Sequence, residues 1–482
     1  MKSIYNPMRI KQLLALIFLV VWHSGCNDWV DIEPENELIK QEFWKTSEDI
    51  YSVMAASYNA LRRTTEKSFL LGEVRADFIS VGGSNYADYS RIGENDITPT
   101  NDKVKWKEYY NTINLANTVM YYAPIVQETD KTLTNSILAG MEAEMLFLRS
   151  LSYFYLVRLW KEVPLVLFPV ISDTVDFYLP KSPEHVILNQ ITNDLKKASA
   201  LAPVTPVSIS SIPKQGRAGK HAIQALLADV YLWKQDYNLC MAYCDSIISS
   251  GLYELENIND WFRLYYPGNS VKESLFEIQY DDKLEGQENP MYENLLNSIG
   301  VDIDYMAFDE ENDIRYCNKW GPVWKYRGID ETGRGRRPDS ERDANFIYYR
   351  YAEVLLMKAE AMAETGSFDE ANYLLRLVAE RGGITHNDTY SLKNFRTALL
   401  TERGREFGGE GKRWFDVLRF AKRNGFEDKK LLMDILIRKA SNANEIAIMR
   451  TKIIDTMSYY IPVHEDEILY NKNMVQNPFY DR

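Results

Sequence analysis

Cysteine is scarce in this sequence, and the few cysteines present do not form a metal-binding pattern. The 482 residues include four cysteines. None belongs to a Cys-x-x-Cys motif or to a Cys/His group at the spacing of a zinc site, so a structural zinc ion is not expected. Cys240 and Cys244 lie one helical turn apart, and we expect both to be buried as small apolar side chains.

The sequence also lacks an excess of positive charge and a long apolar run. The formal net charge is −13, which argues against nucleic acid as a partner. The apolar run Leu13–Trp22 is too short to span a bilayer as a helix, and no other long apolar stretch follows it. Hydrophobic residues make up 45% of the chain, which is enough to build a sizeable core.

Recognisable catalytic motifs are missing as well. There is no Gly-x-Ser-x-Gly elbow, and Gly333–Arg337 does not stand between a strand and a helix as a phosphate-binding loop would. The acidic stretch Asp302–Asp313 lacks the glycine and the closing glutamate of a calcium-binding EF-hand loop. No His-Glu-x-x-His motif includes any of the later histidines, which are His185, His221, His386 and His464.

The centre of the chain carries the strongest helical pattern. In Tyr348–Gly383, apolar residues recur at helical spacing on both sides of Gly366, a residue that suits the left-handed conformation at a helix end. Ser367 and Glu370 stand as a capping-box pair at the start of the second helix. The pattern predicts a helix–turn–helix unit of the tetratricopeptide kind.

A second unit with the same pattern lies earlier, in Gly219–Gly251. Ala228 and Cys240 match Ala359 and Ala371 at one constant offset along the chain. Units so far apart suggest helical hairpins that pack together while the intervening chain leaves the scaffold. Residues 252–345 fit such an insertion because they have little helical periodicity, although residues 274–280, SLFEIQY, predict a strand.

The N-terminus has the organisation of a targeting segment. A basic start precedes the apolar run, and the small residues Ser24 and Gly25 stand directly before Cys26. This arrangement resembles the lipobox of bacterial lipoproteins, in which the signal peptide is removed and the cysteine is lipidated. Residues 1–25 are therefore expected to be a signal peptide and Cys26 the lipid attachment site. An ordinary signal peptide followed by a chance cysteine is the alternative.

Motifs at the start, centre and end of the chain resemble one protein family. Residues 26–34 read CNDWVDIEP, and residues 72–77, GEVRAD, precede a polar loop at Ser84–Thr100. Residues 399–420 read LLTERGREFGGEGKRWFDVLRF, and YYIPV and QNP follow at 459–463 and 476–478. In this order and combination, these motifs resemble the SusD/RagB family of outer-membrane lipoproteins.

The resemblance implies a fold and a division of the chain. The expected fold is mostly α, with tetratricopeptide-like helical hairpins and a large irregular, partly β insertion layer. A single SusD-like domain would follow the signal peptide, at 26–482. Its N-terminal helical part is expected at about 36–250, its ligand-facing insertion at about 252–345 and its C-terminal helical part at about 346–482. We expect the charges of residues 402–419 to form structural ion pairs between helices.

The candidate binding residues combine aromatic rings with polar groups. Neutral sugars present apolar ring faces and hydroxyl edges, which such a mixture can bind. The segments Asn318–Arg327 and Ser84–Asn95 supply it, and the resemblance implies that loops of these regions build the ligand surface. Trp324 and Tyr326 could instead pack the insertion onto the helices. The candidates are Trp320, Trp324, Tyr326, Asn318, Arg75, Asp77, Asn85 and Tyr86.

A basic run in the insertion suggests a second binding hypothesis. Guanidinium groups suit carboxylates and sulfates, so this run could bind an acidic or sulfated glycan. A solvated loop is the simpler interpretation. The four arginines are Arg334, Arg336, Arg337 and Arg342.

By resemblance, the protein is a binding protein and not an enzyme, with no cofactor and no metal ion. It would be lipid-anchored at the cell outer membrane and would deliver oligosaccharide or polysaccharide to a SusC-like TonB-dependent transporter. Three alternatives remain open: a peptide-binding subunit of a similar transporter, a tetratricopeptide scaffold that binds only proteins, and a hydrolase, which requires measurable turnover. The ligand is not determined, because specificity lies in the loops.

Overall fold

The computed structural model describes most of the chain. The described residues are 43–81, 87–171, 178–205, 216–267, 272–284, 286–291, 299–301, 313, 315, 324–329, 335, 337–338, 340–385, 390–440 and 442–481. From Thr46 onward they belong to one compact unit. The described part is mainly helical, as expected, and none of its helices has the length and apolar character needed to cross a bilayer.

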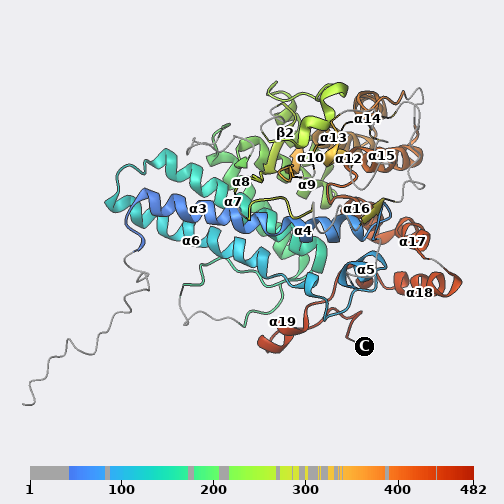
Figure 1. The fold of residues 1–482 in the computed structure, drawn as a ribbon, viewed down its shortest axis with the longest axis horizontal. Coiled ribbons are helices and arrows are strands. Elements are labelled where there is room, and N and C mark those ends of the chain that lie inside the picture. Colours follow the sequence, from blue (N-terminus) through green and yellow to red (C-terminus); the bar gives the residue numbers. More distant parts are fainter. Residues whose placement is uncertain are drawn as a thin grey trace, which may run out of the picture. The chain divides into compact units, whose positions relative to one another are not determined.

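Four long helices build the N-terminal half. They are α3 (Ser47–Arg62), α6 (Lys107–Thr129), α7 (Asn135–Trp160) and α8 (Glu184–Leu201). Helix α7 is central, because it packs against α3, α6 and α8 and is buried continuously from residue 143 to residue 160 (Figure 1). It is apolar all round for much of its length, as is typical of a core helix.

Helix α6 contains a proline and continues past it. Pro124 lies inside the helix, which ends at Thr129. Proline leaves the carbonyl group of residue i−4 without its helical partner. Here Pro124 is exposed and Met120 is only half-buried, so water can reach this carbonyl.

Both predicted hairpins are present. The first pairs α9 (Lys220–Trp233) with α10 (Tyr237–Ile248), and the second pairs α13 (Tyr351–Glu364) with α14 (Phe368–Arg381). Helix α10 packs against α13, so the two units adjoin although about a hundred residues separate them (Figure 1). Cys240 and Cys244 are buried free thiols inside α10, as predicted.

The turn of the second hairpin differs from the prediction in one respect. Gly366 has φ +91°, as expected for a helix end. The Ser367 side chain makes no capping hydrogen bond, so the predicted capping box is wrong. Backbone bonds close the turn instead, with the Ser367 amide donating to the Met362 carbonyl at 2.8 Å and the Gly366 amide to Ala363 at 3.2 Å.

Two small antiparallel sheets join distant parts of the chain. The predicted strand is confirmed as β2 (Ser274–Ile278), and it pairs with β4 (Phe346–Arg350). Strand β4 was not predicted, because its buried aromatic residues run directly into the helical pattern of α13. Strands β1 (Ile79–Val81) and β3 (Ile299–Val301) form the other sheet of the described residues.

The C-terminal part is again helical. It consists of α15 (Leu392–Phe407), α16 (Arg413–Phe426), α17 (Lys429–Arg438), α18 (Ala443–Ile454) and α19 (Glu465–Tyr470). Short helical segments complete the described structure: α4 (Thr65–Phe69), η2 (Leu70–Val74), α5 (Ala87–Gly93), η3 (Asp102–Val104), η5 (Ile258–Tyr265), α12 (Trp324–Arg327) and η7 (Thr456–Tyr459). Helix α16 packs on η2, which brings two of the family-like motifs together.

Candidate functional site

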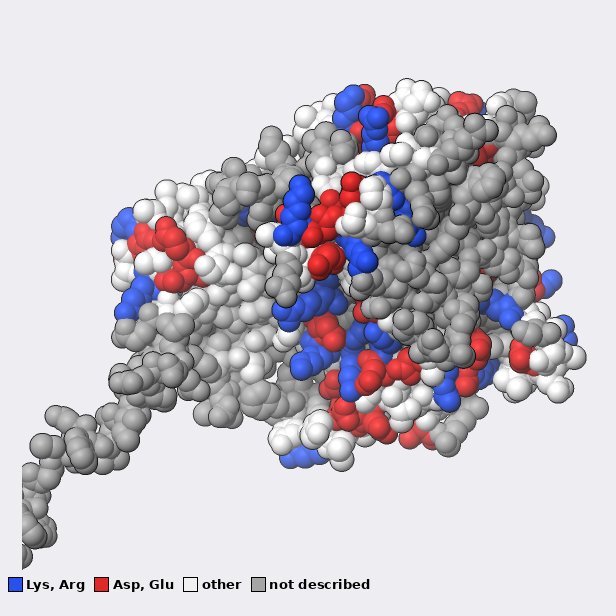
Figure 2. All heavy atoms as spheres, viewed as in Figure 1, with Lys and Arg blue, Asp and Glu red and all other residues white. Residues whose placement is uncertain are grey.

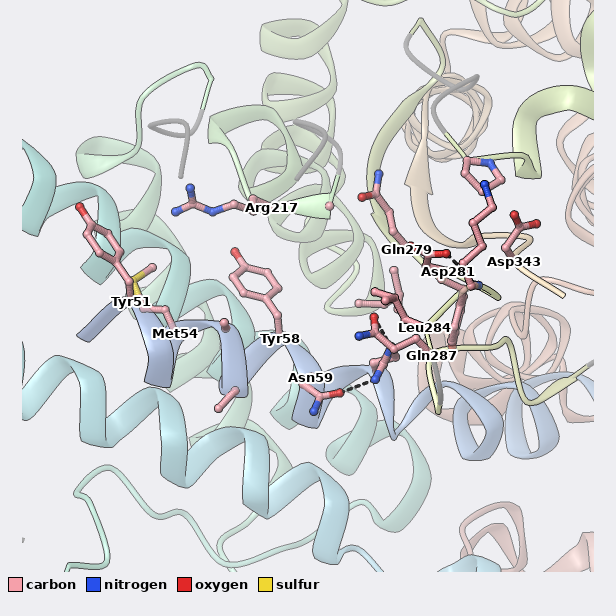
Figure 3. Close-up of a pocket in the computed structure, with 18 residues that line it drawn as sticks. Tyr51, Met54, Tyr58, Asn59, Arg217, Gln279, Asp281, Leu284, Gln287 and Asp343 are labelled. Carbon is pink, nitrogen blue, oxygen red and sulfur yellow. Dashed lines mark hydrogen bonds between the residues drawn. The ribbon is translucent and has the colours of Figure 1, made fainter. Parts of the chain in front are cut away.

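A cleft of about 800 Å³ opens between α3 and the chain that follows β2. One wall is the face of α3 that carries Tyr51, Met54 and Tyr58, and Arg217 lies above it (Figure 3). The facing wall is the segment Ile278–Gln287, which contributes amide, carboxylate and aliphatic side chains. The volume falls within the range of roughly 300–1,000 Å³ that small-molecule sites occupy.

A buried polar cluster holds the helical wall in place. The Tyr58 hydroxyl donates to Glu144 Oε2 at 2.5 Å, and the Arg217 Nε donates to the same oxygen at 3.0 Å. The Ala218 amide donates to the Tyr58 hydroxyl at 3.1 Å. Burial raises the pKa of Glu144 and places the pKa of Tyr58 well above its usual value, so the Tyr58 hydroxyl keeps its proton. This cluster joins α3, α7 and the residues before α9.

The opposite wall is fixed at two points. The Tyr280 hydroxyl shares a hydrogen bond of 2.6 Å with Thr65 Oγ1. Arg62 donates from Nη2 to Asn59 Oδ1 at 2.8 Å and from Nη1 to Gln287 Oε1 at 3.2 Å, and so links the two walls (Figure 3). These contacts give the cleft a preformed shape, which lowers the entropy cost of binding.

The chemistry of the cleft suits binding. Its lining combines tyrosine rings, amide groups and charged groups of both signs. Such a surface can contact an apolar ring face and hydrogen-bond to hydroxyl groups. Across the part of the chain that the structure describes, no cluster of three or more His, Cys, Asp or Glu side chains could hold a metal ion.

The charges of the 402–419 motif form ion pairs inside the protein, as predicted. Between helices, Arg419 on α16 lies 2.8 Å from Glu360 on α13. In a second group of pairs, Arg315 Nη1 lies 2.6 Å from Glu402 on α15, and Arg350 Nη1 lies 2.7 Å from Glu273, the residue directly before β2. The members of this cluster, which we call the insertion network, are Glu273, Asp313, Arg315, Lys325, Arg350, Arg381, Glu402, Glu406 and Glu410. Their side chains are at most 6% exposed.

The neighbouring basic side chains keep the glutamates of this network ionised, although burial favours the protonated form. Burial by itself would raise the pKa of Glu406, but Arg381, Arg350 and Arg315 lower it to well below its usual range. Burial also favours a higher pKa for Glu410, but Arg350 and Lys325 lower that pKa to about 2. Both glutamates are therefore ionised and paired at neutral pH, which is a structural role.

Three candidate residues lie in the core and not at a binding surface. Arg75 is 2% exposed and stacks over Trp414 at 3.8 Å, and Asp77 is 3% exposed and paired with Arg413 at 2.8 Å. Tyr326 is fully buried, where its hydroxyl donates to the Gly409 carbonyl at 2.9 Å. Their prediction as ligand contacts is corrected, because buried and already paired side chains cannot reach a ligand.

Other candidates fall outside the described residues. The backbone of Trp324 belongs to α12, but its side chain is not described. The others stay predictions, and they are Cys26, Asn85, Tyr86, Asn318 and Trp320.

The basic run and the acidic loop are only partly described. Arg337 is buried and paired with Glu341 at 3.0 Å and with Asp343, so it is not free for an acidic glycan. Asp313 is buried against Arg315 at 2.8 Å, which makes it a structural group. Arg334 and Arg336 lie outside the described residues.

Sequence reasoning missed the residues that line the cleft. Tyr51 and Tyr58 recur at helical spacing and are typical of a buried stripe, so the sequence does not separate them from core residues. Gln279 and Gln287 follow a predicted strand and carry no motif. Only the packing of α3 beside the chain after β2 brings the four together.

Comparisons with known proteins agree along most of the chain. The model described as "SusD family" matches residues 305–480, and the SusD-like model described as "Starch-binding associating with outer membrane" matches residues 28–232. SusD-like protein P38 of Formosa agariphila is 26% identical over 473 residues, which cover 84% of this chain and 90% of that protein. A SusD-like protein of Bacteroides ovatus is 24% identical over 467 residues, covering 84% and 82%.

Solved structures share the fold. A SusD superfamily protein from Bacteroides vulgatus aligns with a TM-score of 0.74 at 19% identity, covering 91% of this chain and all of that one. A "Laminarin binding SusD-like protein" aligns at 0.66 and 21% identity, covering 90% and 100%. "Surface glycan-binding protein A" from Bacteroides uniformis aligns at 0.72 and 20% identity, covering 90% and 99%. The chain therefore belongs to the SusD/RagB family, a glycan-binding family associated with the outer membrane, whose members bind their ligands without catalysis.

Proposed function

We propose that the protein is a lipid-anchored lipoprotein of the cell outer membrane that captures oligosaccharide or polysaccharide and delivers it to a SusC-like TonB-dependent transporter. The observation that carries this proposal is family membership together with two proteins of the same fold whose descriptions name laminarin binding and surface glycan binding. The chemistry of the cleft also supports the proposal, because its tyrosine and amide lining suits sugar rings.

The mechanism is capture and transfer, in which no covalent bond is made or broken. A scaffold held by buried ion pairs presents aromatic and polar side chains to the ligand. Within the proposal, Asn318, Trp320 and Trp324 form one part of the ligand surface, and Asn85 and Tyr86 form another.

Lipid attachment at Cys26 would hold the protein beside its transporter. Several acyl chains bind a membrane far more firmly than a single one. Confinement to the same membrane raises the effective concentration of one partner near the other, which favours transfer without new contacts.

The ligand class is tested with the soluble protein lacking residues 1–26, which leaves the compact unit intact. We expect one class in a panel of neutral and acidic polysaccharides to bind in affinity electrophoresis. Trp320→Ala is expected to weaken that binding about tenfold, as loss of an aromatic contact of roughly 1.4 kcal/mol would. If the protein binds peptides and none of the glycans, the proposal of glycan capture is replaced by one of peptide capture.

The anchor is tested by Cys26→Ala in the full chain. We expect the variant to leave the outer-membrane fraction and to co-purify with the transporter less than the wild type does, because the acyl chains are lost. Ser24→Ala, which keeps a small residue before the cysteine, is the matched control. A Cys26→Ala protein that remains in the membrane fraction would contradict the lipoprotein assignment.

A further inference from the structure

We propose that the cleft between α3 and segment 278–287 is itself a binding site for a neutral oligosaccharide, separate from the loops at 84–95 and 318–326. The inference rests on the proposed function for its ligand class. Among the residues that the structure describes, none that lines the cleft belongs to either loop region.

The aromatic part of the site is spread along one helix. Tyr51 and Tyr58 are seven residues apart on α3, which places them about 10 Å apart along the axis at a rise of roughly 1.5 Å per residue. Both side chains are half-buried and line the cleft. Two rings at this separation suit a ligand longer than one sugar unit, and their faces can stack on apolar ring faces.

The cleft is ordered before any ligand arrives. The Tyr58 hydroxyl is held by Glu144, and the Tyr280 hydroxyl is held by Thr65. The Tyr280 ring is buried and forms part of the fixed wall. The Tyr58 ring is half-buried, and because its hydroxyl end is fixed in the protein, the ring is left to contact the ligand. Ordering these side chains in advance removes part of the entropy cost of binding.

Amide groups supply the polar contacts that a sugar needs. Asn59 accepts a hydrogen bond from Arg62 through Oδ1, and among the described residues its Nδ2 donates to no other group. Gln279 donates through Nε2 to Glu277 at 3.2 Å, which leaves its Oε1 as an acceptor. A donor on one wall and an acceptor on the other can bind hydroxyl groups on both edges of a sugar.

The charges of the cleft favour a neutral ligand over an acidic one. Arg217 is paired with Glu144, and Asp343 is paired with Arg337. Lys283 and Asp281 bring one charge of each sign to the same short loop. On the face seen in Figure 2, basic and acidic groups adjoin across the centre and do not gather into a field of one sign. Arg62 also lines the cleft, and its guanidinium donates to the neutral groups of Asn59 and Gln287. A uronate or sulfate would therefore meet single basic groups here and no basic cluster.

Calorimetric titration of the soluble protein with neutral and acidic oligosaccharides of matched length tests the site. Ala55→Trp fills the cleft from an exposed position on α3, at a helix-propensity cost below about 1 kcal/mol. Tyr51→Ala and Gln279→Ala remove single contacts. Tyr373→Ala is the matched control, because this tyrosine is 55% exposed on α14 and does not line the cleft.

We expect two binding events for a neutral oligosaccharide. Ala55→Trp should abolish one of them, and Tyr51→Ala should raise the Kd of that event about three- to tenfold. Trp320→Ala should leave that event unchanged and weaken the other, and Tyr373→Ala should change neither. Circular dichroism of every variant separates loss of binding from loss of folding.

Each other result overturns the inference in a distinct way. If every cleft variant binds as the wild type does and only Trp320→Ala weakens binding, the cleft is rejected as a binding site and the proposed function is still supported. A cleft event seen with acidic oligosaccharides or with peptides alone rejects the neutral ligand class. Binding of no glycan rejects the inference and the proposed function together.

Discussion

Glu73 is a carboxyl group held inside the protein, and no basic side chain among the described residues is in hydrogen-bond contact with it. It is fully buried, and its Oε2 accepts from the Gly411 amide at 2.9 Å and from the Lys412 amide at 3.3 Å. Its Oε1 has no hydrogen-bond partner among the described residues. Burial raises the pKa of Glu73 to about 7, although nearby amides and cations oppose the shift.

This raised pKa predicts a loss of stability with rising pH. The folded state holds the Glu73 proton more tightly than the unfolded state does, so its contribution is complete below pH 4.5 and is lost as the pH rises through about 7. The loss is about 3 kcal/mol, at roughly 1.4 kcal/mol per pKa unit. Glu73→Gln, which mimics the protonated group, should flatten the change in unfolding free energy between pH 5 and pH 8.

Urea denaturation at both pH values measures this effect. The exposed Glu128→Gln serves as the control and should keep the slope of the wild type. If the unfolding free energy of Glu73→Gln changes with pH as much as that of the wild type, another group causes the pH dependence.

Two side chains that were predicted to be exposed, Arg75 and Asp77, are buried in the structure. Arg75 and Asp77 were expected at the ligand surface because they lie in a family-like motif, yet Arg413 and Trp414 take up both side chains. Their partners are more than 300 residues away, and residue type alone does not separate a buried ion pair from an exposed binding pair.

At the scale of elements, local pattern and structure agree well. The periodic stripes predicted two helical hairpins, and both form. Positive φ at Gly366 was expected from its place between two apolar stripes. The capping box at Ser367 failed because backbone bonds already close the turn, and β4 was missed because its aromatic residues run directly into the helical pattern of α13.

Two glycine substitutions should change stability in opposite directions. Gly366→Ala should cost about 1 kcal/mol, because an L side chain is strained at φ +91° although no atom crowds the site. Gly140→Ala should stabilise by about 0.5–1 kcal/mol, because that glycine is helical and an added Cβ would meet only Pro203 at 3.8 Å. Denaturant midpoints test both changes, and a shift of the same sign in both would contradict the backbone argument.

At the scale of the whole molecule, the insertion network joins segments that lie far apart along the chain. Arg350 on β4 contacts Glu273, directly before β2, at 2.7 Å and Glu410, after α15, at 2.9 Å, and it also pairs with Glu406. Arg315 and Lys325 bring the insertion into the same cluster. Each acidic group of the network has a basic partner only when all the segments are in place, so the network specifies how the insertion meets the helices.

Removing the central arginine should therefore be severe. Arg350→Met takes one basic partner from each of three buried glutamates and leaves the network with an excess of buried negative charge, and we expect a loss of at least about 3 kcal/mol in unfolding free energy. Arg263→Met is the matched control, because its 3.2 Å pair with Asp260 is exposed and should contribute less than about 1 kcal/mol. Equal losses in the two variants, measured by urea denaturation, would show that burial does not decide the strength of these pairs.

The sequence by itself determined the helical hairpins, strand β2, the ion-pairing character of residues 402–419 and the family. These features depend on spacing within short segments, and periodicity reports which side of an element is apolar. The tertiary structure alone decided that Arg75, Asp77 and Tyr326 are buried, that β4 pairs with β2, and that α3 and segment 278–287 enclose a cleft. The reason is that exposure depends on what covers a residue, and here the covering groups come from distant parts of the chain.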